Sequence, residues 1–218
     1  MKNLIVTFIL IFTLCGNVRA QFNIPIRVDE NVELMGILAH LAGYGEYCQY
    51  RAGEYDKDID NYFKEHFTHS AVLFMKDLSM RYRIGYDAVA SMGVHLKKGS
   101  DGQFSLAETE EASLEGRWND VDKAKFLTLV SQFYKDTRFH QFFTAHEPFY
   151  QREIQSEKEW KSKHFNKGRL TKFLGIGSED KFSIILSFCG GANSYGTRRH
   201  LKGKKVEVFL VEGYNRGE

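Results

Sequence analysis

The residues closest to a metal site in this sequence are His146 and Glu147. A zinc-hydrolase helix needs two histidines four residues apart, with a glutamate beside the first to activate water. The fifth residue of this segment is Tyr150 rather than histidine, and Pro148 would break the required helix. The segment therefore does not predict an intact zinc site.

Three other histidines are explained without a metal. His66 and His69 lie three residues apart and can share a helix face, but no third ligand lies near them in the sequence. His95 follows an apolar stretch and is interpreted as partly buried. We assign no catalytic residue, no metal ligand and no cofactor to the chain as printed.

Cys189 is a candidate nucleophile, because Gly190 and Gly191 follow it and His200 could serve as its base. The interpretation that we favour is a small buried residue at the end of a strand. In an oxidising compartment Cys48 and Cys189 can pair as a disulfide, or both can remain free thiols.

The glycine-rich segment 190–196 is the most unusual local feature. Its glycines would let backbone N–H groups approach a ligand closely, and a basic stretch follows it. Two interpretations stay open: a mobile, solvated connection, or a loop over residues 190–205 that binds a peptide, a glycan or an anionic ligand. The candidate substrate-facing residues are Gly190, Gly191, Asn193 and Tyr195.

The first twenty residues predict export. Lys2 precedes an apolar run from Leu4 to Leu14, and Val18-Arg19-Ala20 supplies small residues at positions −3 and −1 of a cleavage site. We therefore expect a periplasmic or secreted protein with a signal peptide over residues 1–20 and a single domain over residues 21–218.

The mature chain is expected to be electrically neutral. Cleavage after residue 20 removes Lys2 and Arg19, which lowers the formal net charge from +2 to 0. A neutral domain has no electrostatic footprint for nucleic acid. No second apolar run is long enough to span a bilayer, so no transmembrane segment is expected after cleavage.

Helical periodicity dominates the chain up to about residue 161. Val32, Met35 and Leu38 belong to a buried helix that should end at Ala42-Gly43. Asn119 is the expected cap of a long helix, Pro148 should interrupt another, and residues 97–102 should form a surface loop. Further helices are predicted at about residues 59–67, 72–82, 87–96, 119–134, 139–143 and 149–161.

The last third of the chain changes period. Phe182–Phe188 and Val206–Val211 are short apolar runs rich in β-branched residues, and each predicts a strand. A two-stranded hairpin is marginal by itself and must pack on the helices. The predicted fold class is therefore α+β, a predominantly helical N-terminal part followed by a small β-sheet or hairpin.

Six runs, taken in order, carry a family resemblance: residues 28–34, 41–47, 58–63, 85–89, 92–96 and 188–196. Together they resemble the N-terminal part of domain of unknown function family 4932, a family of exported bacterial proteins. The resemblance covers most of residues 27–213. It implies the scaffold of a zincin-like metallopeptidase acting on a peptide or protein substrate.

Members of that family place a His-Glu-x-x-His helix after the strand that here ends near Val211. The printed chain ends at Glu218, so the resemblance implies a protein without that site, inactive as given and apparently truncated before the zinc-binding helix. Zinc is expected only if a further C-terminal part exists. By analogy with zincins, Val206–Val211 or Asn193–Tyr195 would face the substrate. A complete, non-catalytic binding module remains the alternative.

Overall fold

The computed structural model describes residues 23–107, 114–201 and 205–214, and it confirms the α+β fold class. The predicted signal peptide and Lys202 and Lys204 of the basic stretch lie outside the described residues. No helix in the described ranges is both long and apolar enough to cross a membrane.

The main sheet has four strands in the order β1-β4-β6-β5. The central strand β4 runs parallel to both β1 and β6, whereas β5 runs antiparallel to β6. The expected hairpin of two apolar strands is therefore wrong, because the two runs lie side by side in parallel. The strands are β1 (Ile26–Val28), β4 (Lys181–Ser187), β5 (Ser194–Leu201) and β6 (Lys205–Gly213).

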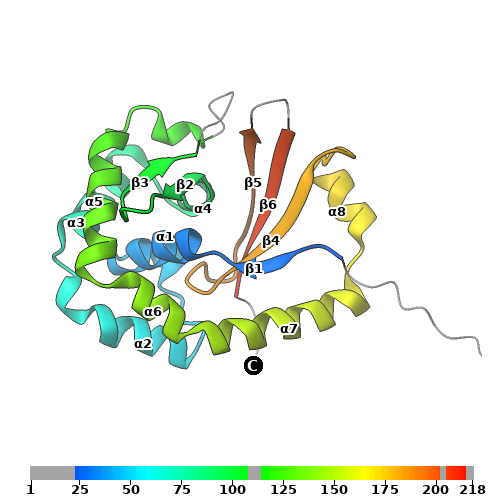
Figure 1. The fold of residues 1–218 in the computed structure, drawn as a ribbon, viewed down its shortest axis with the longest axis horizontal. Helices are drawn as coiled ribbons and strands as arrows, with labels where there is room; N and C mark the ends of the chain where they lie inside the picture. Colours follow the sequence, from blue (N-terminus) through cyan, green and yellow to red (C-terminus); the bar gives the residue numbers. More distant parts are fainter. Residues whose placement is uncertain (1–22, 108–113, 202–204, 215–218) are drawn as a thin grey trace, which may run out of the picture.

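The helix α1 (Glu30–Leu41) forms the centre of the molecule. Asp29 caps its N-terminus by accepting hydrogen bonds from the backbone N–H groups of Asn31 and Val32. Its ten residues from Val32 to Leu41 are all buried, and Gly43 follows with a positive φ of 80°, as the sequence predicted. Figure 1 shows α1 between the sheet and a group of surrounding helices.

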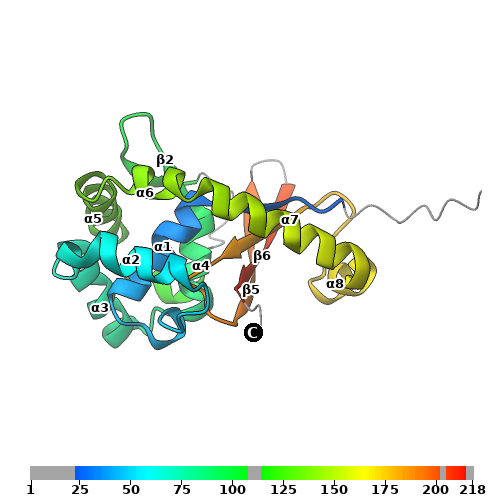
Figure 2. The same ribbon diagram turned by 90° about the horizontal axis from the view of Figure 1, so that it is seen from below.

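The other helices pack around α1 and along the sheet. They are α2 (Glu54–Phe63), α3 (Ser70–Tyr82), α4 (Tyr86–His95), α5 (Lys123–Asp136), α6 (Phe139–Ala145), α7 (Glu147–His164) and α8 (Lys167–Phe173). Three short 3₁₀ turns join them: η1 (Gly45–Tyr47), η2 (Lys64–His66) and η3 (Gly116–Trp118). The long helix α7 spans the molecule from α6 to α8 (Figure 2).

Three local predictions need correction. The expected loop at residues 97–102 contains part of a hairpin, β2 (Leu96–Lys98) paired with β3 (Phe104–Leu106). Asp122, not Asn119, caps α5 by accepting from Lys125 N. A helix boundary near Pro148 is confirmed, because α6 ends at Ala145, but α7 begins at Glu147, two residues earlier than predicted, so Pro148 lies in its first turn, where the missing N–H costs nothing.

Candidate functional site

β5 forms one edge of the four-stranded sheet, and the short strand β1 forms the other. Gly213 N donates to Asn193 O at 2.7 Å, so these two residues are a hydrogen-bonded pair of the antiparallel ladder. In such a ladder every second residue bonds its partner strand, and the residues between direct their backbone groups away. Gly196 and Arg198 therefore direct N–H and C=O away from β6, and no other described strand pairs with β5 there.

A groove with a volume of about 480 Å³ runs along this edge. Phe173 stands beside it with 85% of its surface exposed, and Arg198 donates a short hydrogen bond to Leu174 O. The groove thus combines an unpaired strand edge with an exposed aromatic ring. Its lining comprises Asp87 and Ser91 of α4, Glu115, Phe173 and Leu174, and Gly196, Thr197, Arg198 and His200 of β5, with Val208.

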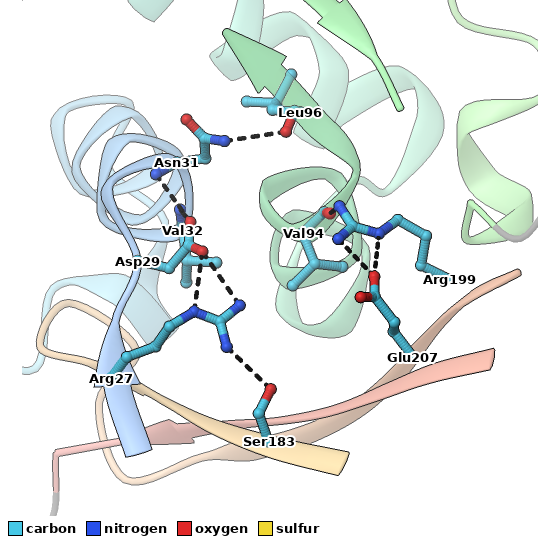
Figure 3. Close-up of polar contacts among 9 residues, drawn as sticks. All are labelled: Arg27, Asp29, Asn31, Val32, Val94, Leu96, Ser183, Arg199 and Glu207. Atoms are coloured by element: carbon cyan, nitrogen blue, oxygen red, sulfur yellow. Dashed lines mark hydrogen bonds and ion pairs between the residues drawn. The ribbon is translucent and has the colours of Figure 1, made fainter. Parts of the chain in front are cut away.

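Arg199 fixes β5 to the helical layer (Figure 3). Its Nε and Nη2 donate to Glu207 Oε2 at 2.9 and 2.6 Å, and its Nη1 donates to Val94 O at 2.6 Å. Val94 lies in the last turn of α4, where carbonyl groups have no partner within the helix. One side chain therefore joins the edge strand, its neighbour β6 and the end of α4.

Arg27, on β1 at the opposite edge of the sheet, makes the equivalent connection on the same face. It donates to the Asp29 carboxylate at 3.3 and 3.4 Å and to Ser183 Oγ at 2.9 Å, so it holds the cap of α1 against β4 (Figure 3). Both guanidinium groups lie near the ring of Phe209, at 5.6 Å for Arg27 and 5.4 Å for Arg199. The sheet is thus held to α1 and α4 by two arginines.

Replacing Arg199 with lysine should lower the free energy of unfolding by about 1–3 kcal/mol. The single ammonium group of lysine cannot reproduce the forked hydrogen bonds of the guanidinium group to the Glu207 carboxylate and to Val94 O. Urea unfolding followed by circular dichroism measures this loss. The matched control is Arg81→Lys, which alters a surface pair with Asp77 on a side chain that is 70% exposed, and should cost less than about 0.5 kcal/mol. Equal losses for both variants would contradict the anchoring role.

The four residues predicted to face a substrate lie in the turn before β5 and at its start, and three of them line one small internal space rather than an open surface. Tyr195 packs with the apolar cluster between the sheet and α4, and its hydroxyl is buried without a described partner. Gly190, Asn193 and Tyr195 line a small internal space. Gly191 packs against Gln49, whose Oε1 accepts from Ala192 N at 3.2 Å. The segment 190–193 is therefore a packed turn that positions the start of β5.

The prediction of a loop over residues 190–205 is wrong for Ser194–Leu201, because these residues form the strand β5. The second expected substrate-facing segment, Val206–Val211, is wrong as well. It lies within β6, which pairs with β4 on one side and β5 on the other, so no backbone group remains for an incoming strand.

Cys48 and Cys189 are free thiols in the structure. Cys48 donates to His40 O at 3.4 Å. Cys189 is buried, and burial raises the pKa of its thiol well above the usual range. His200 pairs in register with Val206, level with the start of β4, whereas Cys189 follows the end of β4. The hypothesis of a Cys189–His200 nucleophile and base is therefore wrong.

A cavity of about 670 Å³ lies between α7 and the ends of β5 and β6. Lys161 is buried in its wall and pairs with Glu157 at 3.1 Å and Glu212 at 2.8 Å. Burial raises the pKa of Glu212, and Lys161 opposes that shift. Ser194 of β5 also lines this cavity, so β5 borders two hollows of the surface.

Comparison with known proteins gives one match. The family described as Domain of unknown function (DUF4932) matches residues 24–213. The chain belongs to this family. No curated protein and no solved structure matches the chain significantly.

The histidines considered as metal ligands in the sequence have other partners in the structure. His146 Nδ1 contacts Phe142 O at 2.8 Å and its Nε2 contacts Asp58 at 3.2 Å, so both ring nitrogens already have partners. His69 accepts from Ala71 N at the start of α3. Within the described ranges, no three histidine, cysteine, aspartate or glutamate side chains come together as a metal site. The donor set present does not fit a zinc ion.

Proposed function

We propose that this member of the family is an exported protein that binds an extended peptide segment by adding it as a further strand to β5. The observation that supports the proposal is the outward backbone of Gly196 and Arg198 in a groove. Main-chain hydrogen bonds of this kind bind peptides with little dependence on their sequence, and side-chain pockets add selectivity.

The groove indicates the side chains that such a peptide would carry. Phe173 and Leu174 form an apolar wall on one side, and Asp87, Ser91 and Glu115 form a polar wall on the other. Because side chains of a strand alternate between two faces, a bound strand would place apolar residues toward α8 and polar residues toward α4. We propose an extended segment with that alternation as the ligand.

We propose further that these 218 residues bind the peptide without hydrolysing it. Zincin-like peptidases need the His-Glu-x-x-His helix, and this sequence contains no such motif. Only the mode of substrate binding is carried over from the metallopeptidase-like resemblance. No reaction step is assigned to a metal.

Export is part of the proposal, because the pattern of residues 1–20 is typical of a cleavable signal peptide. The exported native protein should carry Gln21 as its first residue and should be found in the periplasm or the medium. Intact-mass spectrometry of the native protein measures this. A retained Met1 in a cytoplasmic fraction would contradict export.

A pair of variants at Arg198 tests peptide binding. Arg198→Ala removes the side chain and keeps the outward N–H, whereas Arg198→Pro removes both. Proline is tolerated at a sheet edge where the N–H bonds no neighbour, so both variants should fold. The probe is a mixture of fluorescein-labelled tryptic peptides of reduced casein, followed by fluorescence anisotropy.

We expect Arg198→Pro to bind at least about tenfold more weakly than Arg198→Ala, the effect of one lost backbone hydrogen bond. Circular dichroism should show that both variants are folded. Equal binding by the two folded variants, or no binding by the unmodified protein, would overturn the proposal.

A further inference from the structure

A further hollow lies between α5, α6 and the turn that joins β2 to β3. Figure 1 shows α5 and α6 at the left of the molecule and β5 near its centre. We name this hollow the α5–α6 pocket, and its volume is about 330 Å³. We propose that this pocket binds a small oxyanion, such as a phosphate or a carboxylate group of a larger ligand. The residues that carry the proposal are Lys135, Arg138 and Gln141.

The pocket has an excess of positive charge. Lys135 and Arg138 both line it, both are exposed, and neither forms an ion pair with any carboxylate in the part of the chain that the structure describes. Asp136, between them in sequence, is 58% exposed and contacts His69 instead. Among the described residues, the lining holds two cations, Lys135 and Arg138, and one carboxylate, Asp101, and this excess of positive charge favours an anionic ligand.

Two described carboxylates at or behind the pocket wall, those of Asp101 and Glu30, already have hydrogen-bond partners. Asp101 lines the pocket but turns Oδ1 back onto its own loop, where it accepts from Gln103 N at 3.0 Å. Glu30 accepts from Lys98 at 2.9 Å, from Tyr134 at 2.7 Å and from His140 Nδ1 at 2.9 Å. These bonds hold Tyr134 and His140 in place as walls of the pocket.

The backbone at Arg138 shows which replacement would leave the fold intact. Arg138 has a φ of +51° between the buried residues Thr137 and Phe139, in the left-handed region that suits glycine. A side chain there costs about 1 kcal/mol relative to glycine. Glycine can therefore replace Arg138 without strain in the backbone between α5 and α6.

The variant Arg138→Gly separates binding from folding. Glycine suits the backbone, so the variant should be at least as stable as the unmodified protein while it lacks the guanidinium group. Lys76→Met, which removes one exposed charge from α3, is the matched control. The probe is sodium phosphate, titrated against sodium chloride at equal ionic strength, with the melting temperature as readout, and sodium glucuronate in a parallel arm.

We expect a saturable rise of the melting temperature with phosphate or glucuronate in the unmodified protein and in Lys76→Met. In Arg138→Gly the apparent affinity should fall at least about tenfold. The arm that gives the tighter binding identifies the oxyanion as phosphate or carboxylate. An unchanged titration in Arg138→Gly would overturn the proposal, and so would a failure of both anions to exceed chloride.

Discussion

Replacing Glu33 with glutamine is expected to stabilise the protein at pH 8 by on the order of 3 kcal/mol, and to have little effect at pH 5. Glu33 is fully buried in α1. Its Oε1 accepts from Phe188 N and its Oε2 accepts from Tyr55 OH, both at 2.9 Å. Glutamine can keep both contacts, because its amide donates to the Tyr55 oxygen and Tyr55 then donates to Tyr150.

The direction follows from the pKa of Glu33. Burial raises this pKa from 4.5 to about 7, although the hydrogen bonds from Phe188 N and Tyr55 oppose the shift. The folded state therefore binds its proton more tightly than the unfolded state. The free energy of unfolding should fall as the pH rises from about 4.5 to about 7, and then level off.

Urea unfolding at half-unit steps from pH 5 to pH 8 measures the effect. The difference between Glu33→Gln and the unmodified protein should grow across that range. Glu54→Gln is the control, because Glu54 is 84% exposed and its replacement should leave the pH profile unchanged. Parallel profiles for Glu33→Gln and the unmodified protein would contradict a raised pKa of Glu33 in the folded state.

Replacing Gly213 with alanine is expected to lower the free energy of unfolding by about 1–3 kcal/mol and to weaken peptide binding. A Cβ atom at Gly213 would lie closer than 3.0 Å to the carbonyl oxygens of Gly191 and Asn193. Backbone atoms cannot rotate out of the way, so the turn before β5 must move. The start of the edge strand would move with it.

Thermal and urea unfolding measure the stability, and the casein peptides measure the binding. Gly45→Ala is the matched control, because a Cβ atom there meets nothing within 4 Å and Gly45 has no positive φ. We expect Gly45→Ala to change stability by less than about 0.5 kcal/mol. Gly213→Ala with the stability and binding of the control would contradict the packing described for residues 190–193.

The helical part of the fold was predictable because its signals are local. The apolar positions of α1, its Asp29 cap and its terminal Gly43 all appear in consecutive sequence. Pro148 marked the boundary between α6 and α7, but the sequence did not show that α7 begins before the proline, because a proline is tolerated in the first turn of a helix.

The sheet was less predictable. β1 is three residues long and is stabilised by its partner β4, so its own sequence carries almost no signal. β5 reads Ser-Tyr-Gly-Thr-Arg-Arg-His-Leu, polar and basic, because an edge strand has little apolar surface to bury. A run of this kind resembles a solvated loop, and the pairing with β6 decides its structure.

The candidate site was predictable in place but not in chemistry. Glycines after β4 pointed to residues 190–196, and β5 begins within that segment. The side chain of Tyr195 packs inward, whereas the outward groups are the backbone of Gly196 and Arg198. The direction of a backbone amide depends on strand register, which depends on contacts distant in sequence.

Backbone amide exchange, measured by NMR on the isotope-labelled native protein, tests the central claim most directly. In the free protein the amide protons of Gly196 and Arg198 should exchange rapidly, while that of Thr197, bonded to β6, should be protected. Addition of a bound casein peptide should protect Gly196 and Arg198 as well and shift their resonances. Protection of both amides before any peptide is added, or no change when a peptide binds, would contradict strand addition at β5.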